Sequence, residues 1–282
     1  MKLKLFTYFA VFIFILQLVT PAFAEGELNW ISGPTTVDVD DLATIELSED
    51  YVFLNKEDTV AFNNEIGNYE TGLEIGSIYP ASEDEDWFII FEYDDTTGYI
   101  ENPTEEKIDA DEILASYKEG NEEANKELEK DGFAPINVIG WTKEPFFDSK
   151  TKNLAWALEL ESEGESIVNY NVRLLNRFGS VSAVLVADSS ELERLIPEVD
   201  RVLEGFSFKE GQRYEDFDPE KDKIAQFGLA ALITGGAGVA AVKSGLLATL
   251  LVFVKKFGIL IVAAIGGVIA LIKKVKGKKD KN

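Results

Sequence analysis

The chain contains no cysteine and no histidine. Without cysteine it has no disulfide and no thiolate nucleophile. Without histidine it cannot build a Ser-His-Asp triad, a Cys-His nucleophile or the usual zinc and iron sites. Any catalysis must therefore rest on carboxylates, lysine, tyrosine or a hard metal ion. These absences favour a non-catalytic role and leave enzymatic activity open.

Basic residues are scarce in most of the chain. The 282 residues include 27 Lys and Arg against 51 Asp and Glu, a net charge of −24. Residues 1–24 hold two lysines and no acid, and residues 223–282 hold ten lysines and one acid. Residues 25–222 are left with 15 basic and 50 acidic residues, a net charge of −35. This charge argues against nucleic acid as a partner, because phosphate binding needs concentrated Lys and Arg.

Residues 1–24 are typical of a secretory signal peptide. They carry two lysines near the start, and residues 5–19 are mostly apolar. Ala22 and Ala24 then form the small-x-small pattern that a signal peptidase cleaves. We predict cleavage after Ala24, and the alternative is an uncleaved signal anchor.

The C-terminal end is apolar and finishes in lysines. Residues 227–272 hold three lysines and no acid. We predict a transmembrane helix over residues 257–275, flanked by Lys273 and Lys274, because long lysine side chains can reach the lipid surface from a helix end. The positive-inside rule then places the basic tail, residues 276–282, in the cytoplasm and the acidic middle of the chain outside.

Residues 223–256 precede this span. They are apolar and rich in glycine, and we expect a membrane-proximal helix or a re-entrant segment. The alternative is a two-helix hairpin that turns at Lys255-Lys256 and leaves the basic end outside. Ala263 and Gly267 form a small-xxx-small pair, which allows a homo-oligomer through the C-terminal helix.

The pattern of residues 25–222 predicts an α+β domain, with a largely antiparallel sheet packed with helices, followed by the apolar C-terminal membrane tail. Aromatic and β-branched runs, or alternation of apolar and polar residues, indicate strands. We also expect Gly98-Tyr99-Ile100 to return beside the first strand as a hairpin. The predicted strands cover residues 87–93, 154–160, 167–175 and 181–187, the last two as a hairpin.

Two helices are indicated by their capping patterns. Asp109, followed by Glu112, is expected to begin a helix that extends to residue 130 with an interruption at Gly120-Asn121. Ser190 and Glu193 form a capping box for a second helix, which continues to about residue 203 with apolar residues at helical spacing.

One predicted strand carries a polar face. Asn169, Asn171 and Arg173 alternate with apolar residues and so share one side of the strand. Arg173 can hold a carboxylate or phosphate group through two hydrogen bonds, and the alternative is a salt bridge to a nearby acid. Together with Arg177 and Trp141, these residues form the candidate ligand or partner face. Such a polar set is also the ordinary solvent side of an antiparallel sheet.

Several motifs occur together along the chain: Leu28-Asn29-Trp30 with Gly33-Pro34, Trp87 to Tyr93, Gly98-Tyr99, Ile108-Asp109-Ala110-Asp111, Gly140-Trp141, Leu154-Ala155-Trp156-Ala157, Val168 to Arg173, Gly211-Gln212-Arg213-Tyr214 and Asp222-Lys223-Ile224-Ala225. As a group they resemble a bacterial family of membrane-anchored proteins with an exported N-terminal domain of unknown function. The resemblance spans residues 25–275, and it implies a membrane location without an activity. More faintly, the combination of a Trp-bearing strand, a hairpin and a last helix that leads into Leu203 to Phe208 is similar to the PsbP-like and DcrB-like sandwiches, which are mostly binding and assembly factors.

We therefore expect a membrane-anchored extracytoplasmic accessory or binding protein of the bacterial envelope, held in the cytoplasmic membrane with its N-terminal domain outside. Besides the membrane, the expected partner is an envelope protein or a small ligand. The sequence indicates no cofactor, and its acidic runs lack the spacing of a calcium-binding EF-hand, so it indicates no metal site. Two alternatives stay open. One is a carboxylate- or metal-dependent hydrolase acting on envelope material, and the other is a membrane complex that assembles through the apolar tail.

Overall fold

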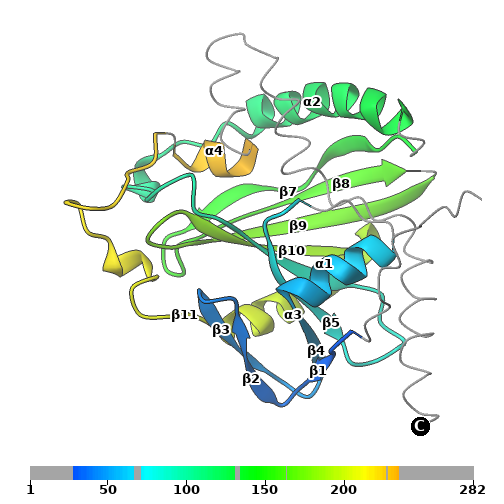
Figure 1. Ribbon diagram of the computed structural model, residues 1–282. Coiled ribbons are helices and arrows are strands. Elements are labelled where there is room, and N and C mark those ends of the chain that lie inside the picture. Colours follow the sequence, from blue (N-terminus) through cyan, green and yellow to red (C-terminus); the bar gives the residue numbers. More distant parts are fainter. Residues whose placement is uncertain (1–27, 67–70, 131–133, 163, 227, 235–282) are drawn as a thin grey trace, which may run out of the picture.

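The computed structural model describes residues 28–66, 71–130, 134–162, 164–226 and 228–234 (Figure 1). The predicted signal peptide with Ala22 and Ala24 lies outside the described residues, as do the predicted span with Lys273 and Lys274 and the basic tail. Within the described ranges, no helix is both long enough and apolar enough to cross a membrane.

The described strands form two antiparallel sheets, and the larger one is the centre of the domain. Its strand order is β1-β4-β5-β6-β10-β9-β8-β7. The central strands consist largely of β-branched, aromatic and other apolar residues, and both of their faces are buried. The strands are β1 (Ile31–Ser32), β4 (Tyr51–Asn55), β5 (Glu74–Pro80), β6 (Phe88–Asp94), β7 (Asn137–Asp148), β8 (Asn153–Ser162), β9 (Glu165–Leu175) and β10 (Ser180–Asp188).

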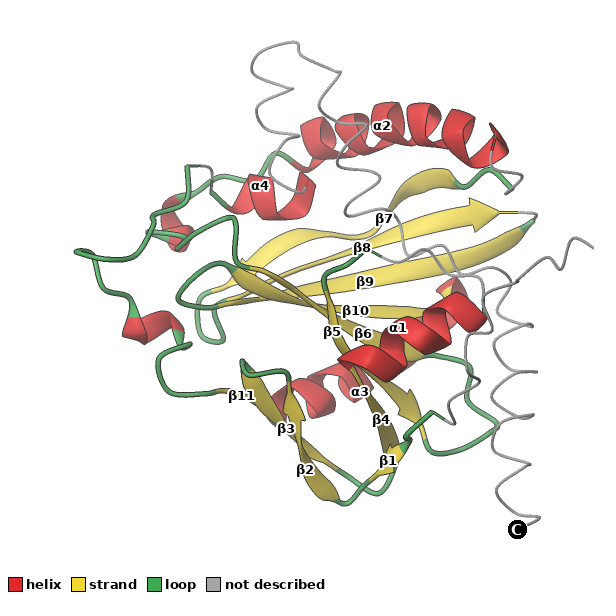
Figure 2. Ribbon diagram, in the orientation of Figure 1, coloured by secondary structure: helices red, strands yellow, loops and turns green. Residues whose placement is uncertain are grey.

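The smaller sheet and one helix cover the first face of the large sheet (Figure 2). The small sheet has the order β11-β3-β2 and consists of β2 (Thr35–Val39), β3 (Ala43–Leu47) and β11 (Phe206–Phe208). Helix α3 (Leu192–Glu204) lies beside it and follows the 3₁₀ turn η2 (Ser189–Glu191). Its apolar stripe is buried in the main core, as the helical spacing of these residues predicts.

Three helices cover the opposite face. Helix α1 (Lys56–Glu65) covers β4 and β5 and is capped by the Asn55 side chain, which accepts a hydrogen bond from the Asp58 backbone N–H at 2.9 Å. Helices α2 (Ala110–Lys130) and α4 (Leu229–Thr234) cover β7, β8 and β9. Two further 3₁₀ turns, η1 (Pro103–Glu105) and η3 (Tyr214–Asp216), lie in connections.

The predicted α+β class is confirmed, with a large antiparallel sheet packed with helices. The predicted hairpin is present as β9 and β10, and the other two predicted strands correspond to β6 and β8. Asp109 caps α2 as expected, because its Oδ1 accepts from the Glu112 backbone N–H at 3.0 Å. The predicted membrane tail beyond residue 234 is outside the described residues.

Two local predictions are wrong in the first half of the chain. Residues 98–100 do not form a hairpin with β6, because β5 and β10 occupy both of its edges and Tyr99 instead pairs in parallel with Ile224. Helix α2 also continues through Gly120-Asn121 without interruption. There the Asn121 side chain accepts from the Val138 backbone N–H of β7 at 3.0 Å, so tertiary contacts offset the low helix propensity.

The predicted capping box of the second helix is also wrong. The Asp188 side chain, rather than Ser190, accepts the capping hydrogen bond, from the Ser190 backbone N–H at 2.8 Å. This bond begins the turn η2, and α3 then starts at Leu192. Asp188 lies directly at the end of β10, so the strand, the cap and the helix follow one another without a loop.

Candidate functional site

The predicted polar face lies on β9, between two apolar clusters. Asn169, Asn171 and Arg173 share one side of the strand as expected, but Asn169 is only 6% exposed and the other two are partly buried. Asn171 lies between Val184 of β10 and Trp156 of β8. Val184 belongs to the cluster beneath α1, and Trp156 belongs to the cluster beneath α2 and α4. The three residues therefore form a polar strip between helix-covered areas.

Arg173 belongs to a row of polar groups that crosses four strands. In the strand register Arg173 is opposite Ser182, Ser182 is opposite Glu92, and Glu92 is opposite Glu74. The Arg173 guanidinium also lies 5.4 Å from the centroid of the Trp156 ring, in cation–π geometry. Burial lowers the pKa of Arg173, and the Glu92 carboxylate opposes this effect. The row thus brings one guanidinium and two carboxyl groups into the interior.

The two glutamates of this row are linked by one threonine. Glu74 is 1% exposed and Glu92 is 7% exposed. The Thr71 backbone N–H donates to Glu74 at 2.6 Å, and the Thr71 hydroxyl donates to Glu92 at 2.8 Å. Burial raises the pKa of Glu92, against the opposing effect of Arg173. The cavity beside Glu92 and Arg173 has a volume of ≈ 20 Å³, about enough for one water molecule, so a substrate cannot enter it.

The other two predicted residues, Arg177 and Trp141, make structural contacts in other parts of the domain. Arg177 Nε and Nη2 donate to the two carboxylate oxygens of Asp222, at 2.6 and 3.0 Å. Trp141 Nε1 donates to the Ala110 carbonyl at 3.0 Å, and its ring packs edge-on against Tyr117. Neither residue lines the small cavity beside Arg173. The five predicted residues are therefore not gathered into one site.

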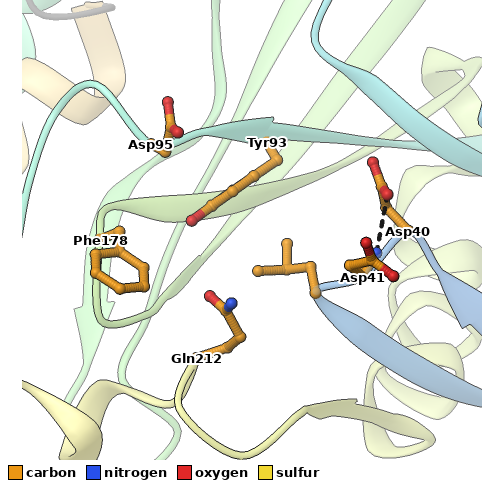
Figure 3. Close-up of a pocket in the computed structure, with 7 residues that line it drawn as sticks. Asp40, Asp41, Tyr93, Asp95, Phe178 and Gln212 are labelled. Carbon is orange, nitrogen blue, oxygen red and sulfur yellow. Dashed lines mark hydrogen bonds between the residues drawn. The ribbon is translucent and has the colours of Figure 1, made fainter.

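A much larger pocket opens on the other side of the sheet (Figure 3). Its volume of ≈ 400 Å³ lies within the range of small-molecule sites. Figure 3 shows the Tyr93 ring crossing the pocket, with Phe178 on one side and Asp40 and Asp41 on the other. The lining residues are Asp40, Asp41, Leu42, Tyr93, Asp95, Phe178 and Gln212.

Two tight turns bring several of these residues together. Asp40 and Asp41 form the turn between β2 and β3, where Asp40 has a positive φ of 51°. Phe178 lies in the β9–β10 turn, which the buried Asn176 side chain closes by accepting from the Phe178 and Gly179 backbone N–H groups at 3.1 and 2.8 Å. Glycine is required at position 179, because a Cβ atom there would lie 2.3 Å from the Asp94 carbonyl oxygen.

The segment after β11 closes the pocket from below in Figure 3. Its Lys209 backbone N–H donates to the Leu42 carbonyl at 3.0 Å, and the Gln212 carbonyl accepts from the Arg177 backbone N–H at 3.1 Å. The bidentate Arg177–Asp222 pair fixes the far end of the segment, and the Arg177 hydrogen bond is the main reason why the pKa of Asp222 is lowered. Arg177 therefore positions a wall of the pocket without lining it.

The pocket combines groups that suit a positively charged ligand. Three carboxylates line it, and the Tyr93 and Phe178 rings offer aromatic surfaces to a cation. Within the described part of the chain, Gln212 Oε1 is buried and accepts no hydrogen bond, so it is free to accept one from a ligand N–H. Burial raises the pKa of Tyr93, which keeps its hydroxyl protonated.

Sequence reasoning missed this pocket. Asp40-Asp41 and Asp94-Asp95 stand out as acidic runs, but nothing in the sequence indicates that two runs more than 50 residues apart meet. Phe178 lies in the turn expected between two strands, and Gln212 belongs to the Gly211-Gln212-Arg213-Tyr214 motif, but neither pattern indicates a pocket. Only the pairing of β6 with β10, and of β2 with β3, brings these segments to one place.

Comparison with known proteins identifies a family to which the sequence is similar. The family model described as "Protein of unknown function (DUF2167)" matches residues 31–266. The chain belongs to this family. The membership confirms the family resemblance inferred from the sequence motifs, and the description of DUF2167 assigns no activity. A search of the curated proteins found no match.

Among solved structures, this DUF2167 chain is similar to the solution structure of cyanobacterial PsbP (CyanoP) from Synechocystis sp. PCC 6803. The two chains share 10% sequence identity with a TM-score of 0.34, and the match covers 67% of this chain and 96% of that chain. This is the faint PsbP-like resemblance expected from the sequence. A likeness of this size carries no argument about function.

Proposed function

We propose that the protein is a membrane-anchored accessory protein of the bacterial envelope, whose extracytoplasmic domain binds another envelope component. Residues 1–24 would direct export, and residues 257–275 would hold the chain in the cytoplasmic membrane. The contrast between a strongly acidic middle and a lysine-rich end supports this arrangement, because positive charge is retained on the cytoplasmic side.

The pocket between β6 and the β2–β3 turn carries the binding role. Its carboxylates Asp40, Asp41 and Asp95 and its aromatic rings fit a positively charged group, such as a lysine or arginine side chain of a partner protein or a small amine. We therefore place the proposed contact face at this pocket instead of at the polar strip on β9, since the strip is largely covered by helices.

The hydrolase alternative gains no support from the buried pair Glu74 and Glu92. Glu74 and Glu92 lie directly opposite each other on β5 and β6, but both are buried and the adjacent cavity holds about one water molecule. A glycosidase needs its two carboxyl groups to flank a substrate bond. We therefore assign this pair to the interior of the fold.

Site-specific photo-crosslinking in cells tests the proposed function. A photoreactive amino acid replaces Asp41 at the mouth of the pocket in the full-length protein, or Glu83, an exposed acid in the β5–β6 connection that does not line the pocket, in the control. We expect a defined envelope protein to be captured from position 41 and not from position 83. Capture should fall sharply when Asp95→Asn is combined with the probe at position 41.

The outcomes separate the partner classes. Identical capture from both positions would contradict a pocket-centred contact. Absence of any protein adduct at position 41, together with a thermal stabilisation of the protein by small amines that Asp95→Asn abolishes, would identify a small ligand instead of a protein. Absence of both effects would overturn the proposed role of the pocket.

A further inference from the structure

Helix α4 belongs to the core of the domain, although its sequence is the beginning of the apolar tail. Leu229 is 0% exposed, Leu232 is 6% exposed and Ile233 is 3% exposed. They pack in one cluster with Trp156 of β8 and Ile113 of α2. Burial of these side chains in protein stabilises the docked position of α4, since each removes a large apolar surface from water.

Polar contacts fix both ends of this short helix. The Glu106 carboxylate accepts hydrogen bonds from the backbone N–H groups of Leu229 and Ala230. The Tyr117 hydroxyl of α2 donates to the Ile233 carbonyl. Because hydrogen bonds and apolar packing act together, the point at which the tail leaves the domain is held in a defined place.

The chain that follows needs an apolar environment at once. Residues 235–254 contain a single charged residue, Lys243, and are rich in Ala, Val and Leu. Twenty residues of this composition are costly to expose to water. With the chain held by the proposed membrane anchor, lipid supplies that environment, and the lipid surface then comes within a few residues of Thr234, where α4 ends.

We propose that the corner of the domain formed by α4, residues 103–107 and Ile224 faces the bilayer, so that the domain is held against the membrane in one orientation. The proposal rests on the membrane anchor of the proposed function. The partner is the lipid surface, and the small sheet with β2 lies on the side away from it, at the opposite end of the molecule in Figure 1.

One exposed apolar side chain lies at this corner. Among the described residues, the large apolar side chains that are well exposed are Ile139 and Phe146 of β7, at 46% and 45%, and Ile224, at 45%. Ile224 lies five residues before α4, at the proposed corner. Phe146 is opposite Ala155, which belongs to the core on the other face of the large sheet, so Phe146 does not bear on the orientation. An apolar side chain at the headgroup boundary lowers its free energy by inserting partly into the bilayer, whereas the same side chain facing water has no such stabilisation.

The absence of cysteine makes this orientation measurable in the full-length protein. Single cysteines are introduced by Lys107→Cys at the α4 corner or Thr36→Cys on β2, both exposed positions, and each is labelled with a fluorophore. The protein is reconstituted into phosphatidylcholine vesicles that carry a nitroxide quencher on the headgroup. We expect several-fold stronger quenching at position 107 than at position 36.

A linker variant provides the matched control. Insertion of a flexible Gly-Ser segment between residues 234 and 235 should make the quenching at the two positions similar, because the domain then rotates freely above the membrane. Equal quenching without the insertion, in protein that floats with the vesicles, would overturn the orientation and leave the anchor intact. Failure of the chain to float with the vesicles would overturn the anchor, and the orientation with it.

Discussion

Replacement of Leu229 by alanine tests whether the first turn of the apolar tail stabilises the domain. The Leu229 side chain is completely buried and packs against the cluster that contains Trp156. A buried Leu→Ala substitution costs about 2–5 kcal/mol, from the lost transfer free energy and the cavity that remains. Since a domain of this kind has a total stability of about 5–15 kcal/mol, the loss is large enough to measure easily.

The assay is urea unfolding of the full-length protein in mild detergent, with tryptophan fluorescence as the probe of unfolding. We expect the urea midpoint of Leu229→Ala to fall while the slope of the transition stays the same. Ile224→Ala is the matched control, because Ile224 is similar in size but 45% exposed, and a surface substitution changes stability by about 0.5 kcal/mol or less. If the Leu229→Ala midpoint falls no further than that of Ile224→Ala, α4 is not part of the core and the reasoning is refuted.

Four further outcomes are expected. Arg177→Met removes the partner that lowers the pKa of Asp222, so the variant should be less stable than wild type at neutral pH, with the difference shrinking as the pH falls through the lowered pKa of Asp222. Glu92→Gln should raise the urea midpoint at pH 8, because ionised Glu92, with its raised pKa, destabilises the fold there, and the gain should disappear as the pH falls through that pKa. Deletion of residues 235–282 should move the protein from the membrane fraction to the soluble fraction. Mass spectrometry of the exported chain should show loss of residues 1–24.

The central strands could be predicted because their signals are local. Residues 167–175 alternate between apolar and polar side chains, and the β9–β10 hairpin follows from this alternation and from the turn at Asn176. The alternation correctly groups Asn169 with Arg173, but it does not indicate what covers them. Helices α1 and α2 cover the areas on either side of the strip, and the nearer of them in the chain, α2, ends 39 residues before Asn169.

Burial of polar residues was the least predictable feature of the sheet. Glu74 and Glu92 read as ordinary acids in an acidic chain, yet they are 1% and 7% exposed. Their burial depends on the pairing of β5 with β6 and on Thr71, whose hydrogen bonds satisfy one oxygen of each carboxyl group. Such compensation by partners distant in sequence, or on an adjacent strand, leaves no periodic signal.

Hydropathy cannot separate burial in protein from burial in lipid, and residues 227–234 illustrate the ambiguity. Both environments remove the same apolar surface from water, so Leu229 and Ile233 read as part of a membrane tail although they complete the cluster around Trp156. The folded domain therefore includes α4, which ends at Thr234. A soluble fragment that ends at residue 222 would leave that cluster open to water and lose the Glu106 and Tyr117 contacts. A fragment that ends at residue 234 should unfold cooperatively, at a higher urea concentration than the shorter fragment.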